Sequence, residues 1–387
     1  MAPSYAVYTR HVGCEIVKGT NVKVPFNRLQ EPSRAERARL LGEISDVIAS
    51  GIYINGPKTE RFLSEFGSYV GSPHVVPVGN GTDALEVALR ALGVSAGETV
   101  YTVANAGGYS TTAIRQLGAH PTFIDVSPDD LQICPESLAQ TLQATSKKPS
   151  ALVVTHLFGA MAPVQEVVKI CEPFGIPVVE DCAQAIGVRS QGRHVGTFGK
   201  VATFSFYPTK NLGGVGDAGA IGTDDPLLAE KISSLAQYGW TAKYTVEEPL
   251  GRNSRMDEVQ AAVLLGRLER IDESNRERLS IYRELSSANL SIDFVHRDSP
   301  NFNAHLAVLR VQNRVAAEEY FAQCGIETVV HYPIPDHKQR AYEYIGEPLS
   351  VTEESSTKVL SIPCHPRLSR KQVDGLLDAL TRAPFYS

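Results

Sequence analysis

The amino-acid sequence predicts an α/β protein in which a large domain with a mixed β-sheet precedes a smaller α+β domain. The first observation is a set of short runs rich in β-branched residues, among them ALVVTHLF, IPVVED and VATFSF, which alternate with helical stretches. The second is that these runs are continuously apolar, a pattern typical of strands buried on both faces. The third is a change to a long helical pattern at Met256, after which new strand and helix patterns begin.

The N-terminal part of the chain begins with residues 1–24, which show no period and are predicted to form a loose extension. A highly charged helix is expected from Pro32 to Ile48, and the segment NGPKTERFLSEFGSYVG predicts a second helix with its aromatic residues on one face. A strand over Val75–Val78 and a further helix flank the turn Gly79–Asn80–Gly81. The alternation that follows assigns residues 25–270 to the large domain.

The C-terminal part of the chain, residues 271–387, predicts the smaller domain. One long helix is expected from Met256, and its charged second half forms the bridge between the two domains. The strand LAVLRV, a helix from Ala316 to Gln323, the run ETVVHYPIP and a last helix from Lys371 to Leu380 follow it. The sequence therefore predicts two domains.

Composition and charge exclude several classes of protein. The chain of 387 residues carries 37 Lys and Arg against 43 Asp and Glu and forms no basic stripe, so nucleic acid is not an expected partner. No apolar run approaches the roughly 20 residues that span a bilayer, and no signal segment is present, so we expect no membrane association and a cytoplasmic location. The 6 cysteines are scattered and the histidines lack metal-ligand spacing, so we expect neither disulfides nor a metal.

The segment from Gly79 to Asp83 is a candidate anion site, because it lies between a predicted strand and a predicted helix. Thr82 is expected to be the N-cap residue of that helix. Free backbone N–H groups and the positive end of the helix dipole favour an anion at such a place. From the residues alone, a capped turn without a ligand explains the segment equally well.

Asp181 is a second candidate, because it ends the predicted buried strand IPVVED. Open α/β sheets bind ligands at the carboxyl ends of their strands. Its neighbour Glu180 is expected to point to the opposite face, since side chains alternate along a strand, so the two are not expected to form a catalytic pair. An isolated carboxylate at a strand end is also typical of a cap or a salt-bridge partner.

The segment SFYPTKNLGGVGDAGA is a glycine-rich loop with one lysine, Lys210. Gly214, Gly216 and Gly219 match G-x-G-x-x-G, but a strand rather than a helix follows them, which excludes a dinucleotide site. No P-loop lysine is present, and no G-x-S-x-G surrounds Ser205, so a hydrolase triad has no support. A lysine fixed between a strand and a glycine-rich turn can form an imine; a solvated loop lysine is the alternative.

An anion-binding helix start, a strand-end carboxylate and a glycine-anchored lysine are together the three parts that a pyridoxal phosphate enzyme requires. The helix N-terminus holds the phosphate, the aspartate keeps the pyridine nitrogen protonated, and the lysine forms a Schiff base. The sequence therefore predicts pyridoxal 5'-phosphate as the cofactor, with Lys210 and Asp181 as its reactive partners.

Five motifs in this order resemble those of the DegT/DnrJ/StrS family of nucleotide-sugar aminotransferases: GNGTDAL, VVEDCAQAIG, SFYPTKNLGGVGDAGA, GRNSRMDEVQAA and VVHYPIPDH. The resemblance covers most of the chain from Pro25. It implies an aspartate-aminotransferase type of fold (PLP fold type I) and a homodimer with active sites at the interface. It also implies that L-glutamate converts the cofactor to pyridoxamine 5'-phosphate, which then aminates a keto group of a nucleotide-linked deoxysugar, in amino-sugar biosynthesis.

The resemblance also assigns roles to individual residues. Lys210 is the Schiff-base lysine and later moves the proton, and Asp181 pairs with the pyridine nitrogen. Gln184 lies near the cofactor ring, and Asn253 reaches the phosphate of the neighbouring subunit. The remaining contacts implied are Gly81, Thr82, Asp83 (through its backbone) and Ser205 for the phosphate, and Tyr207, Tyr244, His331 and Tyr332 for the sugar.

Two segments depart from the family pattern. Gly107 and Gly108, in VANAGGYSTTAI, stand where family members carry an aromatic residue that stacks on the cofactor ring, so Tyr109 is expected to replace it. The family's GYNYRM appears here as GRNSRM. FYPTKNLGGVGD, YGWTAKY and RNSRMDE are more similar to members that act on 3-keto sugars than to those that act on 4-keto sugars, which favours a 3-keto substrate.

Two alternative functions remain open at this stage. No residue excludes an aminocyclitol (keto-inositol type) aminotransferase. A pyridoxal-phosphate-binding regulator without turnover is the other, although the short extension leaves no room for a DNA-binding domain. Dehydratase relatives carry histidine in place of the lysine, so Lys210 argues against that activity.

Overall fold

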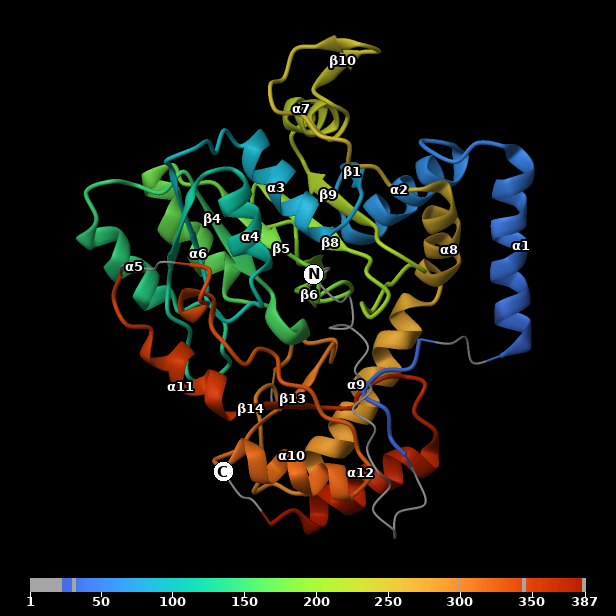
Figure 1. Cartoon of the computed structure of the whole chain (residues 1–387), viewed down its shortest axis with the longest axis vertical. Coiled ribbons are helices and arrows are strands. Elements are labelled where there is room, and N and C mark those ends of the chain that lie inside the picture. The colour runs from blue at the N-terminus through green and yellow to red at the C-terminus, as the bar shows by residue number, and fades with distance from the viewer. Residues whose placement is uncertain (1–22, 30–32, 298, 343–345, 385–387) are drawn as a thin grey trace, which may run out of the picture.

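The structure is a computed structural model that describes residues 23–29, 33–297, 299–342 and 346–384. The predicted extension at residues 1–24 therefore lies almost entirely outside the described part. A large α/β unit and a smaller unit lie one above the other in Figure 1, joined by a long helix. Within these described ranges, no helix is both long enough and apolar enough to cross a membrane.

A mixed sheet of seven strands forms the centre of the large unit, as predicted. Its strands are β1 (His74–Val78), β2 (Thr99–Thr102), β3 (His120–Phe123), β4 (Ala151–Thr155), β5 (Val178–Asp181), β8 (Val201–Ser205) and β9 (Gly219–Thr223). They lie in the order β1-β9-β8-β5-β4-β2-β3. β9 runs antiparallel to β1 and β8, and the pairs from β8 to β3 are parallel. The parallel pairs bring the carboxyl ends of β8, β5 and β4 to one edge.

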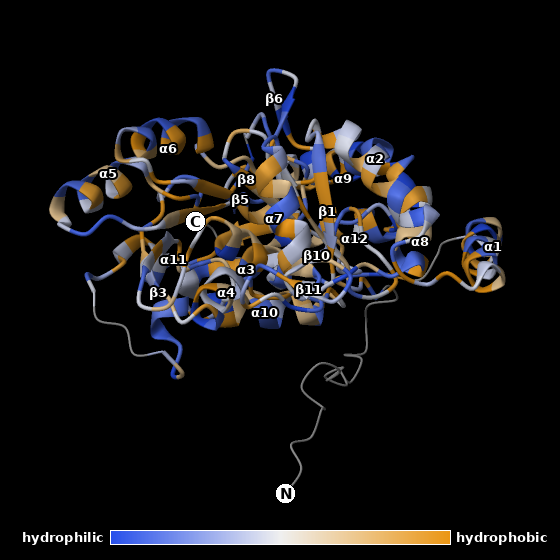
Figure 2. Cartoon of the chain, turned by 90° about the horizontal axis from the view of Figure 1, so that it is seen from above, coloured by the Kyte–Doolittle hydropathy of each residue, from blue (hydrophilic) through white to orange (hydrophobic). Residues whose placement is uncertain are grey.

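Helices cover both faces of this sheet. On one face lie α3 (Gly81–Ala91), α4 (Tyr109–Gln116) and α7 (Pro226–Ala236). On the other lie α2 (Pro57–Val70), α5 (Pro135–Ala144), α6 (Val164–Cys171) and α8 (Glu258–Leu268), and Figure 2 shows these layers from above. Because side chains alternate along a strand, Val153 packs with the first set of helices, while Leu152 and Val154 pack with the second.

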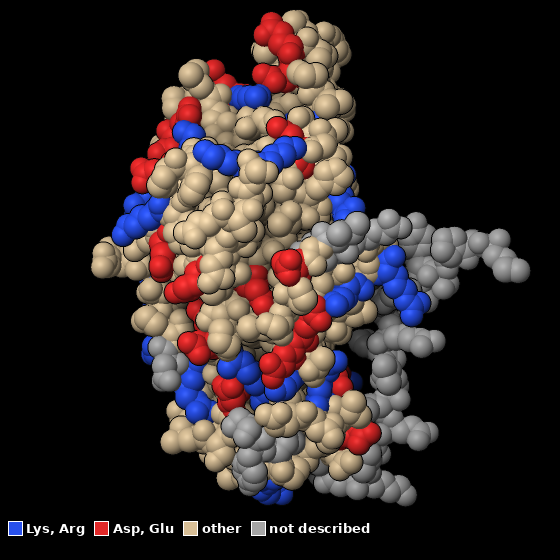
Figure 3. All heavy atoms as spheres, turned by 90° about the vertical axis from the view of Figure 1, so that its left-hand side faces the viewer, with Lys and Arg blue, Asp and Glu red and all other residues tan. Residues whose placement is uncertain are grey.

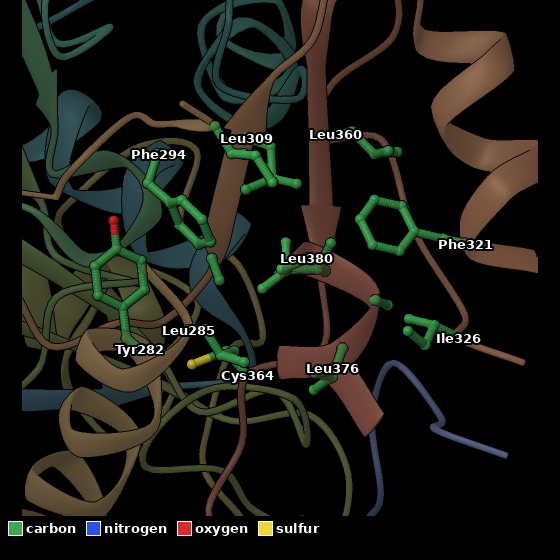
Figure 4. Packing of buried hydrophobic residues seen from close by; sticks show 14 of the residues in the cluster. Tyr282, Leu285, Phe294, Leu309, Phe321, Ile326, Leu360, Cys364, Leu376 and Leu380 are labelled. Atoms are coloured by element: carbon green, nitrogen blue, oxygen red, sulfur yellow. The ribbon is translucent and has the colours of Figure 1, made fainter. Parts of the chain in front are cut away.

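The smaller unit has its own hydrophobic core around a three-stranded antiparallel sheet. Its elements are α9 (Ile271–Ala288), β12 (Asp293–Phe294), β13 (Ala307–Arg310), α10 (Arg314–Gln323), α11 (Ser350–Lys358), β14 (Val359–Ile362) and α12 (Arg370–Arg382). In Figure 4, Leu285, Phe321 and Leu380 point into this core from three different helices. We propose that the two domains meet between residues 270 and 271, because α9 already contributes to the core of the smaller unit.

The single long helix predicted from Met256 is wrong: α8 and α9 are two helices, separated at Glu269 and Arg270. The two helices serve different cores, since α8 packs against α2 in the large unit and α9 against α12 in the small one. Ile271, the first residue of α9, still packs in the core of the large unit, and Tyr282 and Leu285 pack in that of the small unit. No Gly or Pro between Arg267 and Ala288 marks the break, so the sequence predicted a continuous helix.

Two elements lie at the edge of the molecule (Figure 1). α1 (Arg34–Ser50) lies beside α8, and its Leu41 and Ile48 are both 60% exposed. A hairpin of β10 (Trp240–Ala242) and β11 (Thr245–Val246) projects beyond α7; a second short hairpin pairs β6 (Arg189–Ser190) with β7 (Arg193–His194). On the face in Figure 3, basic and acidic side chains are interspersed, so no single sign of charge dominates that face.

Candidate active site

Three parallel strands end side by side at the carboxyl edge of the sheet. The strand register pairs Thr155 of β4 with Asp181 of β5, and Asp181 with Thr203 of β8. All three residues line a cavity of about 730 Å³. This is the edge at which parallel α/β sheets bind ligands. Residues of α3 and of the smaller unit complete the cavity.

Asp181 and Glu180 point to opposite faces of β5, as their alternation predicted. Asp181 lines the cavity, where burial raises its pKa above the usual value, and the Ala183 amide and the charge of Lys210 oppose that rise. Glu180 is fully buried elsewhere and hydrogen-bonds to His156. The two carboxylates therefore do not form a pair, and Asp181 alone faces the cavity.

The start of α3 is capped by Asn80 and not by Thr82, so the predicted N-cap was wrong. The Asn80 backbone is extended, and its Oδ1 accepts a hydrogen bond from the Asp83 amide at 2.8 Å. The helix begins at Gly81, one residue before the expected cap. Among the described residues, the Gly81 and Thr82 amides have no acceptor, and both residues line the cavity. Such free amides at a helix N-terminus bind anions.

Ser205, at the end of β8, lies directly against the start of α3. A Cβ atom at Gly81 would lie 2.7 Å from Ser205 Cβ and 3.1 Å from its Oγ, so the close approach requires glycine. The Ser205 Oγ accepts a hydrogen bond from the Tyr207 amide at 3.4 Å, which leaves the hydroxyl proton free to be donated. The two amides and this hydroxyl thus lie at the same end of the cavity.

Lys210 follows β8 in a tight loop and lines the cavity. Its amide donates to the Tyr207 carbonyl at 2.8 Å. A Cβ atom at Gly213 would lie 2.7 Å from the Pro208 carbonyl oxygen, so the glycine-rich run allows the loop to fold back on itself. Burial lowers the pKa of Lys210, against the opposing charge of Asp181, and so favours a neutral amine at Nζ.

A sequence model that describes the DegT/DnrJ/EryC1/StrS aminotransferase family matches residues 34–381. The chain belongs to this family. It is therefore a pyridoxal-phosphate-dependent aminotransferase of PLP fold type I, as the motifs predicted.

Several characterised proteins are similar to this aminotransferase over nearly their full length. The erythromycin biosynthesis sensory transduction protein EryC1 of Saccharopolyspora erythraea is 36% identical, over 92% of this chain and 98% of that protein. The dTDP-3-amino-3,4,6-trideoxy-alpha-D-glucose transaminase of Streptomyces venezuelae is 36% identical, over 92% of this chain and 95% of that protein. The crystal structure of S. venezuelae DesV in complex with a ketimine intermediate is 36% identical with a TM-score of 0.87, over 93% of this chain and 98% of that one.

The cavity of the aminotransferase fits pyridoxal phosphate. Its free amides at Gly81 and Thr82, beside the Ser205 hydroxyl, suit a phosphate group. Its buried carboxylate, Asp181, suits a protonated ring nitrogen, and the Lys210 amine suits an aldehyde carbon. These groups come from α3, β5, β8 and the loop after β8, and all line one cavity.

Most other predicted residues of the aminotransferase also reach this cavity. Those that line it are Gln184, Tyr109, Tyr207, His331 and Tyr332. The Gln184 Oε1 accepts a hydrogen bond from the Phe158 amide at 2.6 Å, and its Nε2 donates to the Tyr332 hydroxyl at 3.2 Å. Burial lowers the pKa of His331 to about 4, so its imidazole is neutral at pH 7.

Three predicted residues lie away from the cavity lining of their own chain. The Asp83 carboxylate pairs with Arg252 at 2.8 Å and accepts a hydrogen bond from Ser254 Oγ at 2.6 Å. Asn253 is exposed, and Tyr244 is 76% exposed on the β10–β11 hairpin. The roles expected of these residues stay predictions.

Sequence reasoning missed some residues that line the cavity, among them Asn27, Thr155 and His305. Thr155 carried a usable signal, because it ends the buried strand ALVVT next to the strand of Asp181. No sequence signal indicated Asn27 or His305, since no motif surrounds either residue. His305 precedes β13 and is held by a hydrogen bond between its Nδ1 and Asn211 Oδ1 at 2.8 Å, a contact between distant segments.

Proposed function

We propose that this aminotransferase transfers an amino group from L-glutamate to the C3 keto group of a nucleotide-linked deoxysugar, in amino-sugar biosynthesis. The observation that carries the proposal is that Lys210, Asp181 and the free amides of Gly81 and Thr82 line one cavity. Its volume of about 730 Å³ lies within the range of roughly 300–1,000 Å³ typical of small-molecule sites.

Each of these residues has a role that follows from its surroundings. When bound, pyridoxal phosphate supplies an electron sink for the carbon that gains or loses the amino group. Burial lowers the pKa of Lys210 and so favours the neutral amine, the form in which Nζ can accept a proton and return it at a second carbon. Asp181 would hold a protonated ring nitrogen, whose charge offsets the burial of the carboxylate. The Gly81 and Thr82 amides would bind the phosphate.

The names of several relatives support the C3 position and the donor. The relatives from Streptomyces venezuelae and Aneurinibacillus thermoaerophilus are named for dTDP-3-amino sugars, and one from Pseudomonas aeruginosa for a UDP-linked 3-oxo sugar. A Bacillus subtilis relative, 28% identical, is named a 3-oxo-glucose-6-phosphate:glutamate aminotransferase. Position 3 of the sugar is common to these names, as a 3-amino group in two and a 3-oxo group in two, which agrees with the preference drawn from the motifs.

The proposal includes a homodimer with shared active sites. Two features support it. Asn253 is exposed and lies outside the cavity lining of its own chain, as a residue donated to a neighbouring subunit would. Leu41 and Ile48 on α1, and Tyr244 and Val246 on the projecting hairpin, are exposed apolar side chains that a second copy of the chain would cover.

The test is a half-reaction followed by the absorbance of the bound cofactor. Adding L-glutamate to the purified protein is expected to remove the absorbance of the aldehyde form, and a dTDP- or UDP-linked 3-keto sugar is expected to restore it. Lys210→Ala should abolish both changes, whereas Lys169→Ala, on the exposed side of α6, should leave both intact. An active Lys210→Ala protein would overturn the proposal.

The same screen separates the alternatives. Restoration by a 4-keto sugar alone would move the reaction to C4, and restoration by a keto-inositol alone would make the substrate an aminocyclitol precursor. Two relatives carry regulatory names, EryC1 and the pleiotropic regulatory protein of Geobacillus stearothermophilus. Cofactor binding without conversion of any of these substrates would support a regulatory role instead.

A further inference from the structure

We propose that the ring of Tyr332 covers the pyridine ring of the cofactor, a role that the sequence suggested for Tyr109. The inference rests on the proposed placement of the cofactor between Asp181 and Lys210, and Tyr332 lines the same cavity as both. It adds a stacking residue from the C-terminal part of the chain to a site whose other cofactor contacts come from the large unit.

Gly107 and Tyr332 are fitted to each other. A Cβ atom at position 107 would lie 2.6 Å from Cε1 and 2.7 Å from Cζ of the Tyr332 ring. Gly107 has a φ of 80°, in the left-handed region that disfavours side chains. The turn before α4 thus exposes bare backbone, and the tyrosine ring fills the space that a side chain there would take.

Contacts on both sides of the ring hold it in this position. The Asp336 amide donates to the Ala104 carbonyl at 2.8 Å, and the Asp336 carboxylate accepts a hydrogen bond from Thr111 Oγ1 at 2.5 Å. These two bonds tie the segment that carries Tyr332 to the turn that carries Gly107. Gln184 holds the other end of the ring by donating to the Tyr332 hydroxyl at 3.2 Å.

The surroundings of the two tyrosines favour Tyr332 over Tyr109. A ring that stacks on a ligand must be held in a fixed position by the surrounding protein. The Tyr332 side chain is partly buried and is held by the hydrogen bond from Gln184 and by its fit against Gly107, whereas the Tyr109 side chain is 48% exposed. The ring centroids of the two lie 6.3 Å apart at an interplanar angle of 79°, so the two rings meet edge to face. Tyr109 therefore supports the ring of Tyr332 and does not replace it.

The first test measures cofactor affinity, by titrating the apoprotein with pyridoxal phosphate, and the visible circular dichroism of the bound cofactor. Tyr332→Leu keeps an apolar side chain without the aromatic ring. It is expected to weaken binding about two- to tenfold, the range of one aromatic stacking contact, and to change the dichroism band. Tyr332→Phe keeps the ring and should retain both. Thermal unfolding of each apoprotein shows whether it is folded.

A matched pair of glycine variants tests the fit between Gly107 and Tyr332. Gly107 and Gly108 have φ angles of 80° and 82°, so an alanine is equally strained at either. At position 108, however, the added Cβ would meet nothing nearer than Asp336 Oδ1, at 3.9 Å. Gly107→Ala should therefore weaken cofactor binding more than Gly108→Ala, and the difference should disappear in a Tyr332→Ala background.

Two results would overturn the inference. One is a Tyr332→Leu protein with wild-type affinity and dichroism. The other is a loss of affinity in Tyr109→Ala with none in Tyr332→Leu, which would assign the stacking to Tyr109. Failure of the proposed function gives a different result, because L-glutamate and the 3-keto sugars would then leave the absorbance of the bound cofactor unchanged whatever residue stands at position 332.

Discussion

The first prediction concerns Glu180 and its contribution to the stability of the carboxyl end of β5, next to the active site. Its side chain is fully buried and accepts hydrogen bonds at both oxygens. Oε1 accepts from the amides of Phe198 and Gly199 at 2.7 and 2.6 Å. Oε2 accepts from the Gly196 amide at 2.7 Å and from His156 Nε2 at 2.9 Å. The substitution Glu180→Gln keeps the shape and replaces one acceptor oxygen by a donor.

The size of the effect follows from the donors around Glu180. The Ala162 amide donates to His156 Nδ1 at 3.1 Å, so the imidazole proton lies on Nε2 and points at the carboxylate. All four partners are therefore donors, and an amide nitrogen accepts from none of them. Losing two hydrogen bonds to a charged group, at roughly 1.5–3 kcal/mol each, lowers the free energy of unfolding by about 3–6 kcal/mol. At roughly 2 °C per kcal/mol for a long chain, the apparent Tm falls by about 6–12 °C.

The pH dependence of the destabilisation caused by Glu180→Gln gives a second measurement. Burial raises the pKa of Glu180, but the hydrogen bonds from His156 and from the amides of Gly199 and Gly196 outweigh it, and the pKa ends below its usual value. A lowered carboxyl pKa contributes stability above the unfolded-state pKa of about 4.3, and this contribution is lost as pH falls through the folded pKa. The Tm difference between wild type and Glu180→Gln should be constant from about pH 6 to 8 and shrink below about pH 4.

Differential scanning fluorimetry across this pH range measures both effects. Glu230→Gln, on the exposed side of α7, is the matched control and should change the Tm by less than about 1 °C. A Glu180→Gln protein with the wild-type Tm at pH 7 would refute the reasoning. His156, Glu180 and Cys182 lie close enough to hold a metal ion; insensitivity of the Tm to chelators would agree with the four hydrogen bonds as the stabilising contacts.

Two further predictions concern the phosphate end of the cavity. Gly81→Ala would place a Cβ atom 2.7 Å from Ser205 Cβ, so pyridoxal phosphate affinity is expected to fall in a titration, by an overpacking energy of about 1–3 kcal/mol; Gly42→Ala, which meets nothing within 4 Å, should not lower it. Asn253→Ala should weaken cofactor retention in its own homodimer. A mixed dimer pairs an Asn253→Ala subunit with a Lys210→Ala subunit, and one of its two sites then holds both Lys210 and Asn253. That site should retain the cofactor, and a mixed dimer that retains no more cofactor than the Asn253→Ala homodimer would contradict a shared site.

Local sequence patterns were sufficient for the elements that carry the predicted cofactor contacts. Asp181 ends an apolar strand, and Lys210 stands between a strand and glycines, so the position of each along the chain already indicated its place at the sheet edge. Gly81 was found for the same reason, as part of a strand–turn–helix pattern. The capping residue was misassigned because Asn80 and Thr82 are both good N-caps and only the backbone conformation decides between them.

The sequence by itself determined the fold class, the family and the residues whose role depends on their immediate neighbours along the chain. Only the tertiary structure decided which distant segments meet. It brings Tyr332 against Gly107, places His305 in the cavity and divides the predicted long helix into α8 and α9. The physical reason is that helix and strand periods act over a few residues, whereas these contacts follow from the packing of the large sheet against the smaller unit.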